Sequence, residues 1–254
     1  MSILSVLTWE QLALALIVAT LAGTIKGLVG FAMPMILISG LGTVMSPELA
    51  LAGLILPTLF TNGVQALRQG PRAAWETVRR FRMFLLLGGV TLLASAQLVR
   101  VLSPEAMLLI IGVPITGFAI WQLLGAPLHL AAANARLEAG LAVVAGFIGG
   151  LSGVWGPPVV AYLTALQTPK LDQMRIQGVV YGLAGLALLG AHLGSGVLNA
   201  GTAPFSALLV APALLGMWIG GRMQDGIDQR AFRMATLVVL LIAGLNLIRR
   251  ALMG

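Results

Sequence analysis

The sequence contains no cysteine, which excludes disulfides, thiolate metal sites and cysteine nucleophiles. It is also poor in charge: of its 254 residues, 9% are charged and 59% are hydrophobic. An average soluble domain has roughly 25% charged and 45–50% apolar residues. No polar stretch reaches the ~50 residues of the smallest independent soluble domains. The composition therefore predicts an all-α integral membrane protein with a single transmembrane domain over residues 1–254.

Acidic residues are scarcer than basic ones, eight against 15, which gives a net charge of +7. A membrane protein acquires such a balance from basic cytoplasmic loops, so no nucleic-acid partner is expected. All eight acids fall at segment ends or in loops, which predicts no buried carboxylate relay for protons. Three alternatives stay open for ion exchange. His192 titrates, or Na⁺ is held by backbone carbonyls at a helix break, or protons are not involved.

Long apolar runs recur from end to end, and each is long enough, or nearly so, to cross a bilayer. The first run has no Lys or Arg ahead of it, which favours a retained span over a cleaved signal peptide. Proline near the start of several runs marks helix beginnings. The ten predicted segments are 5–24, 27–45, 47–67, 83–101, 106–124, 136–153, 155–168, 174–198, 203–221 and 231–249.

The chain repeats itself at a shift of 123 positions, which places 22–41 over 145–164. Both copies contain Gly-x-x-x-Gly-x-x-Gly-x-x-x-Pro, a pattern that is rare by chance. The sequence therefore predicts two repeats of five segments each, about 5–124 and about 136–250.

An odd number of crossings per repeat would turn the second repeat upside down. Five arginines lie between the third and fourth segments, whereas the equivalent junction at 199–203 has none. By the positive-inside rule these junctions lie on opposite sides, and the full alternation puts 12 of the 15 Lys and Arg residues in the cytoplasm. We therefore predict inverted repeats with the N-terminus outside.

The number of crossings stays open between 8 and 10. Segments one and two, and six and seven, form either two crossings each or a re-entrant hairpin. Segment seven, 155–168, is short for a full span, which favours a hairpin or a broken helix there.

The first Gly-rich motif contains Gly23, Gly27, Gly30 and Pro34, residues that suit a discontinuous helix. Backbone amides around Gly27 and Gly30 at a half-helix N-terminus would bind an anion. The alternative is close helix packing through small residues four positions apart.

Lys26 lies inside the motif, where a charge costs roughly 2.5–3.5 kcal/mol on membrane-insertion scales. It is either the counter-charge of an anionic substrate or a cytoplasmic loop lysine that snorkels to the surface. Gly149 takes its place in the second copy, so a site of this kind would be asymmetric.

Other polar residues of the apolar segments are candidates for the same site. The second copy offers Ser152 and Gly153 as donors and Trp155 as an apolar wall, although an interfacial anchor also explains the tryptophan. Two stripes lie on helical faces, where interhelical hydrogen bonding is the alternative to a pore. They are formed by Thr58, Thr61, Asn62 and Gln65, and by Gln177 and Tyr181.

An intramembrane serine protease is an alternative, because residues 150–153 are Gly-Leu-Ser-Gly, as in rhomboid-type proteases, and His192 could supply a base. The repeat weakens this alternative. The first copy has the same glycines at 27–30 without a serine, so the glycines have another purpose.

The twin motifs "AGTIKGLVGFAMP" and "GFIGGLSGVWGPPVV", with the ten-segment layout, resemble the TauE/SafE sulfite-exporter-like family over nearly the whole chain. The resemblance implies a secondary transporter of the bacterial inner membrane for sulfite or short organosulfonates, not an enzyme, without a cofactor. An anion channel of the same fold is the alternative, and a coupling ion (H⁺ or Na⁺) and a homodimer stay open. The residues expected to bind the anion are Lys26, Gly27, Gly30, Thr58, Asn62, Ser152, Gly153, Trp155, Gln177 and Tyr181.

Overall fold

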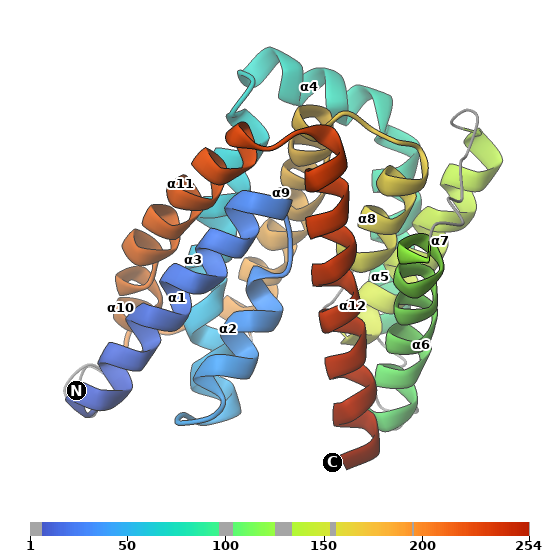
Figure 1. Ribbon diagram of the computed structural model, residues 1–254. Helices are drawn as coiled ribbons and strands as arrows, with labels where there is room; N and C mark the ends of the chain where they lie inside the picture. Colours follow the sequence, from blue (N-terminus) through green and yellow to red (C-terminus); the bar gives the residue numbers. More distant parts are fainter. Residues whose placement is uncertain (1–6, 97–103, 125–133, 153–155, 195, 254) are drawn as a thin grey trace. The chain divides into compact units, whose positions relative to one another are not determined.

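The computed structural model describes residues 7–96, 104–124, 134–152, 156–194 and 196–253, which form helices and no strand (Figure 1). The helices of the first half are α1 (Trp9–Val29), α2 (Met33–Leu41), α3 (Pro47–Leu67), α4 (Pro71–Arg80), α5 (Arg82–Ala96) and α6 (Pro104–Leu123). Those of the second half are α7 (Ala135–Ser152), α8 (Gly156–Ala165), α9 (Lys170–Gly194), α10 (Ala203–Leu208), α11 (Val210–Gly226) and α12 (Gln229–Met253).

Five helices of the described residues are long and apolar enough to cross a membrane. They are Trp9–Val29, Leu49–Leu67, Lys170–Gly194, Ala203–Gly226 and Gln229–Met253. A shorter apolar helix covers Arg82–Ser95. The prediction of an all-α, multi-pass membrane protein is therefore confirmed for the part of the chain that the structure describes.

Predicted and observed segments agree best where proline marks a helix start. The third segment, 47–67, has the bounds of α3, whose first turn is capped by Ser46 accepting a hydrogen bond from the Leu49 amide at 3.3 Å. The ninth segment is divided at Leu209 into α10 and α11. α4 lies in the Arg-rich stretch between the third and fourth segments, where the sequence predicts a junction rather than a helix.

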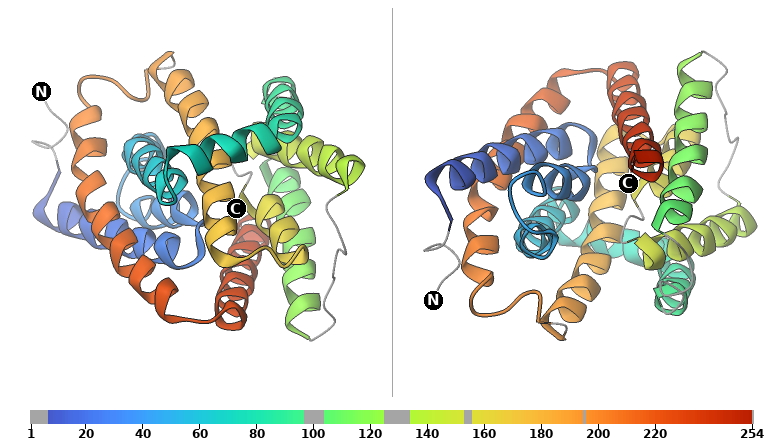
Figure 2. Two further views of the ribbon diagram at one scale, coloured as in Figure 1. Left: turned by 90° about the horizontal axis from the view of Figure 1, so that it is seen from above. Right: turned by 90° about the horizontal axis from the view of Figure 1, so that it is seen from below.

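The chain folds into two compact units, each built from both halves of the sequence. Unit 1 consists of Met1–Ala74 and Met174–Asp228, and unit 2 of Trp75–Gln173 and Gln229–Gly254. In unit 1, α1 packs along α11; in unit 2, α5 packs along α7 and α6 along α12 (Figure 2).

In unit 1, α1 and α2 run in opposite directions. A capping box of Thr8 and Gln11 starts α1. The Gln11 side chain also donates to the Val44 carbonyl at 2.8 Å, and Gly40 of α2 packs on Val18. The chain thus returns after α2 to the end from which α1 started. The nine residues of α2 extend only about 13 Å, which is less than half of a bilayer core.

Glycines bring α1 and α11 into backbone contact. A Cβ on Gly23 would lie 2.1 Å from the Ala213 carbonyl oxygen, and a Cβ on Gly27 would lie 2.2 Å from that of Met217. The contacts are reciprocal, because Gly216 and Gly220 of α11 meet carbonyls of α1 equally closely. The packing alternative for the first motif is therefore confirmed at Gly23 and Gly27.

Unit 2 uses the same kind of contact between α5 and α7. A Cβ on Gly146 would lie 2.3 Å from the Gly88 carbonyl oxygen, and the Ser95 hydroxyl donates to the Gly146 carbonyl at 3.4 Å. Tyr162 of α8 donates to Glu138 at 2.9 Å and ties α8 to the start of α7.

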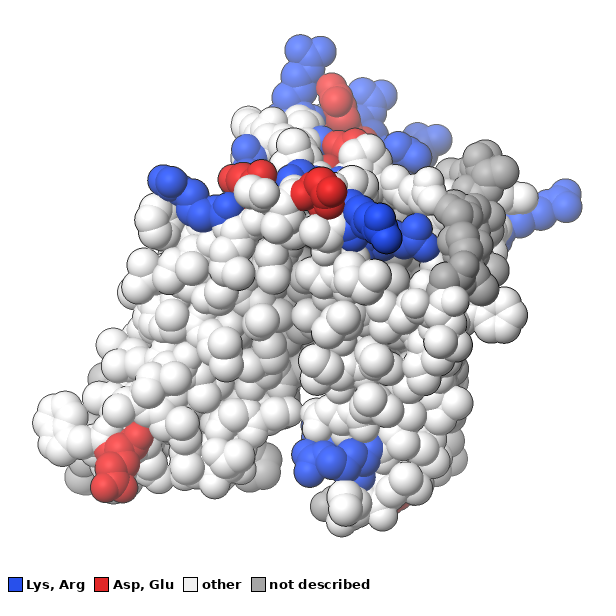
Figure 3. Space-filling model, in the orientation of Figure 1, with Lys and Arg blue, Asp and Glu red and all other residues white. Residues whose placement is uncertain are grey.

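Apart from α4, the described helices carry their charged residues near their ends, and large parts of the surface in Figure 3 carry no charged side chain. The acids follow this rule as the sequence predicted: Glu10, Glu138 and Asp172 lie in the first turns of α1, α7 and α9, and Asp225 lies in the last turn of α11. Within the described spans the interior carries no carboxylate.

Candidate functional site

The break in the first Gly-rich motif lies later than the sequence suggested. α1 continues through Val29, and Gly30 ends it in the left-handed conformation with φ 89°. Ala32 is also left-handed, with φ 72°, and α2 begins at Met33. The predicted junction at 25–26 is therefore wrong, because Lys26 and Gly27 belong to the last turns of α1.

This position changes the role of the two glycines that were expected to bind an anion through their amides. Gly27 lies within α1, where amides donate along the helix. The Gly30 amide donates to the Lys26 carbonyl at 2.7 Å. The helix end at Gly30 is a C-terminus, so the expected anion-binding amides are not at Gly27 and Gly30. Unpaired helix amides belong instead to the first turn of α2, whose N-cap Ala32 provides no side-chain acceptor.

Lys26 is among the largest fully buried side chains of the described residues, with 1% of its surface exposed. Its ammonium donates to the Asn62 side-chain oxygen of α3. The Asn62 nitrogen in turn donates to the Tyr181 carbonyl of α9 at 3.0 Å. Among the described residues no carboxylate pairs with Lys26. The alternative of a loop lysine that snorkels to the surface is therefore wrong.

Two glutamines hold the carbonyl end of α1. The Gln65 nitrogen donates to the Gly30 carbonyl at 3.1 Å and to the Met174 carbonyl at 2.8 Å. When its amide is oriented by the hydrogen-bond network, Gln177 donates to the Gly30 and Val29 carbonyls at 3.1 and 3.3 Å. These bonds replace the partners that the last carbonyls of a helix lack, and they fix the turn of α1 that carries Lys26.

The polar stripe on α3 is buried, as its spacing along the helix suggested. Thr58 is 6% exposed, and Thr61, Asn62 and Gln65 are at most 1% exposed. Thr61 donates to the Pro57 carbonyl at 2.7 Å. The Thr58 hydroxyl and the Gln65 side-chain oxygen have no hydrogen-bond partner among the described residues. One turn of helix separates the Thr58 hydroxyl from Asn62.

Unit 1 thus brings seven of the ten expected site residues into its interior. They are Lys26, Gly27, Gly30, Thr58, Asn62, Gln177 and Tyr181. Gln65 was recognised in the stripe but not as a site residue, although its position three residues after Asn62 pointed to the same face.

The residues of the second copy belong to unit 2. Ser152 is the last residue of α7 in unit 2, and Gly153 and Trp155 lie outside the described residues. His192, the base of the protease alternative, belongs to α9 in unit 1.

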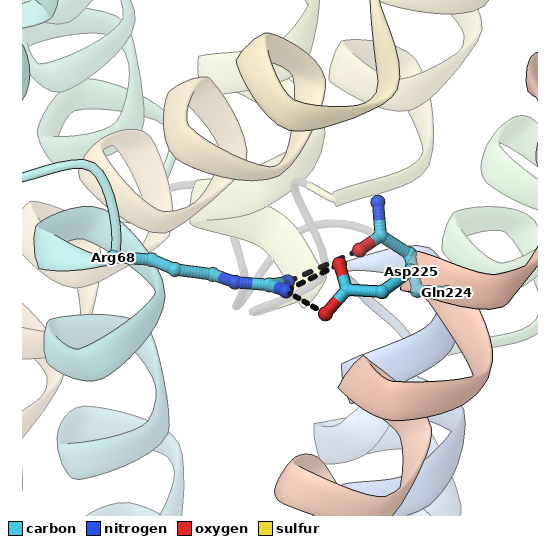
Figure 4. A network of polar contacts seen from close by, with 3 residues as sticks. All are labelled: Arg68, Gln224 and Asp225. Atoms are coloured by element: carbon cyan, nitrogen blue, oxygen red, sulfur yellow. Dashed lines mark hydrogen bonds and ion pairs between the residues drawn. The ribbon is translucent and has the colours of Figure 1, made fainter.

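An ion pair ties two helix ends together one turn beyond Gln65. Arg68 donates to both carboxylate oxygens of Asp225, at 2.6 and 2.7 Å, and to the Gln224 side-chain oxygen at 3.1 Å (Figure 4). Both charged side chains are partly exposed, 33% and 52%. Exposed pairs of this kind contribute little to stability, so its structural effect is to align the C-terminal ends of α3 and α11.

A bundle of apolar spans with a broken helix and a buried lysine defines a polytopic membrane protein with a polar site inside the bundle. The family model "Sulfite exporter TauE/SafE" matches residues 15–247, nearly the whole chain. The chain belongs to the TauE/SafE sulfite exporter family, whose members are membrane transporters rather than enzymes. No curated protein and no solved structure matches the chain significantly. The family match favours the transporter over the protease.

Proposed function

We propose that the protein is a secondary transporter for sulfite or a short organosulfonate, and that Lys26 in unit 1 forms its anion-binding site. The observation that carries this proposal is a fully buried lysine whose partner is an amide oxygen rather than a carboxylate. A charge at membrane depth costs roughly 2.5–3.5 kcal/mol on insertion scales. A bound anion offsets that cost, which a neutral amide does only in part.

The donors around Lys26 suit a compact oxyanion. An ammonium has three N–H groups, of which Asn62 accepts one. The Thr58 hydroxyl is buried and without a partner among the described residues, so it is available as a second donor. Sulfite and sulfonates stay ionised at neutral pH and present several acceptor oxygens. Hydrogen bonds from one charged and one neutral donor would replace part of their hydration shell while leaving binding weak enough for release.

The other expected residues of unit 1 support this proposal. Gly27 allows the close approach of α11, while Gly30 and Gln177 hold the turn that follows Lys26. The Tyr181 carbonyl fixes Asn62. For the second copy, Ser152, Gly153 and Trp155 remain candidates from the sequence alone.

The packing within the units supports the proposed inverted repeat. Gly23 of α1 packs on α11, and its counterpart at a shift of 123, Gly146 of α7, packs on α5. α5 occupies the place in the first repeat that α11 occupies in the second. We propose that α2 and α8 are the short arms of re-entrant hairpins, as expected where irregular backbone lines a transport site.

The orientation of the proposed repeat can be tested in a chain without cysteine. Gln65 contacts Met174 at the start of α9, so Ala73 lies near that end of unit 1 and Ala200, beyond the other end of α9, lies opposite. Single cysteines at Ala73 and Ala200 are expected to react with impermeant thiol reagents from opposite sides of the bacterial inner membrane, with Ala73 cytoplasmic. Labelling of both from one side would refute the inverted topology.

The proposed anion-binding site is tested by giving Lys26 a permanent counter-charge. Asn62→Asp places a carboxylate where the amide oxygen accepts from Lys26, so an anion has to displace it. Sulfite uptake by reconstituted vesicles is expected to fall about tenfold, the equivalent of ~1.4 kcal/mol, without a fall in melting temperature. Uptake is measured with sulfite, methanesulfonate and chloride.

Asn246→Asp provides the matched control, because Asn246 of α12 accepts from Arg249 near the end of that helix. It is expected to transport as the wild type does. If Asn62→Asp also transports all three anions at the wild-type rate, Lys26 does not hold the substrate.

A further inference from the structure

The strongest unexplained feature outside the proposed anion site is α4, a short helix between two apolar ones. Its ten residues extend about 15 Å, and its charges exclude it from the bilayer core. One face is buried: Ala74 and Thr77, with Phe81 just after the helix, are at most 9% exposed. The opposite surface contains exposed arginines and the indole of Trp75, which is 62% exposed.

The charge of this segment is strongly one-sided. From residue 71 to 82 the chain carries four arginines and one acid, Glu76, which gives 4 − 1 = +3. The side chains of Arg79 and Arg82 are exposed and have no hydrogen bond or ion pair with any described residue. Lys and Arg side chains gather over α4 in the space-filling view (Figure 3).

Aromatic rings accompany the arginines, which is the composition of the membrane–water interface. Trp75 and Arg79 are four residues apart and therefore neighbours on the helix surface. The Arg80 guanidinium lies over the Phe81 ring, 5.3 Å from its centroid. A second pair at the end of α11 has the same form, with Arg222 4.8 Å from the ring centroid of Trp218. Guanidinium groups suit phosphate oxygens, to which they donate in pairs.

We propose that α4 is an interfacial helix and that its Trp75 and Arg79, together with Arg82 at the start of α5, bind the headgroups of anionic phospholipids. The buried face of Ala74, Thr77 and Phe81 fixes the helix to the protein. The indole then lies at headgroup level and the guanidinium groups pair with lipid phosphate. Charge complementarity favours an anionic lipid, because its surface attracts each nearby basic residue and a zwitterionic surface offers no net attraction.

The proposal is tested on the full-length protein in nanodiscs that contain phosphatidylglycerol and phosphatidylcholine. Native mass spectrometry counts the retained lipids, and the melting temperature is compared between discs of each pure lipid. The wild type is expected to retain phosphatidylglycerol and to melt several degrees higher in that lipid, with a difference that shrinks at high salt. Arg79→Gln/Arg82→Gln is expected to remove both preferences while melting as the wild type does in phosphatidylcholine.

Arg249→Gln/Arg250→Gln at the end of α12 removes the same charge from another exposed place and serves as the control. It is expected to keep both preferences. An equal loss in the two double variants would overturn the proposal, because net charge alone would then explain it. An unchanged preference after Arg79→Gln/Arg82→Gln, or the same stabilisation by inorganic phosphate in phosphatidylcholine discs, would overturn it as well.

Discussion

Replacing Lys26 by methionine is expected to abolish most anion uptake while the protein still inserts and folds. Methionine has nearly the length and volume of lysine without its charge, so it fits the buried position and removes the cost of a charge at membrane depth. A hydrogen bond to a charged group is worth about 1.5–3 kcal/mol, which corresponds to a loss of about 10- to 100-fold in affinity. Initial rates of sulfite uptake into vesicles with equal amounts of reconstituted protein measure the effect.

The chain offers a matched control in its other lysine, Lys170, at the start of α9. Lys170→Met changes the same charge at a helix end and is expected to transport at close to the wild-type rate. If Lys26→Met transports normally, the buried lysine has no part in anion binding. If both variants lose uptake equally, the change in net charge rather than the anion-binding site is responsible for the loss.

Gly27→Leu is expected to prevent folding of unit 1 rather than only to block transport. A Cβ at this position would lie 2.2 Å from the Met217 carbonyl oxygen and 2.8 Å from the Gly221 nitrogen, both of them backbone atoms of α11. α1 and α11 would have to separate along the contact in which Gly23, Gly216 and Gly220 also take part. The expected result is loss of the monodisperse peak in size-exclusion chromatography after detergent extraction.

The same substitution in open surroundings tests whether the effect comes from packing. Gly89 lies in α5 with no atom within 4 Å of the position of an added Cβ. Gly89→Leu is therefore expected to leave the elution profile unchanged. A folded but inactive Gly27→Leu variant would instead return Gly27 to the anion-binding site that the sequence suggested.

The helical bundle could be predicted from the sequence because apolar runs and their proline boundaries follow directly from the physics of the bilayer. α3 shows this clearly, since Ser46 and Pro47 define its start in the sequence and in the structure. The burial of its polar stripe also followed from the spacing of Thr58, Asn62 and Gln65, because polar groups in a span avoid lipid.

The position of the break in the first motif could not be predicted in this way. Residues on both sides of Gly30 are apolar, so hydropathy contains no boundary there. The charge of Lys26 suggested a junction, but Asn62 accepts its hydrogen bond within the bundle and α1 continues for three further residues. The glycines were ambiguous for a related reason: helix packing and backbone approach to a ligand need the same absence of a side chain.

Mean hydropathy does not reveal α4, because the arginines dominate the average over this segment. The spacing of Ala74, Thr77 and Phe81 is the signal that would have found it, since positions i, i+3 and i+7 share one helical face, and the structure buries all three. The role of Gln65 depended on the place where α1 ends, which the sequence did not define.

Counterflow of labelled sulfite tests the central claim most directly, because it shows whether a binding site inside the bundle exchanges one anion at a time across the membrane. Wild-type protein is reconstituted into vesicles loaded with excess unlabelled sulfite, and tracer sulfite is added outside. A secondary transporter with its anion-binding site at Lys26 is expected to accumulate tracer transiently above equilibrium. This overshoot should be suppressed by external methanesulfonate and absent in Lys26→Met. Tracer that only equilibrates, or an overshoot of wild-type size in Lys26→Met, would contradict the account.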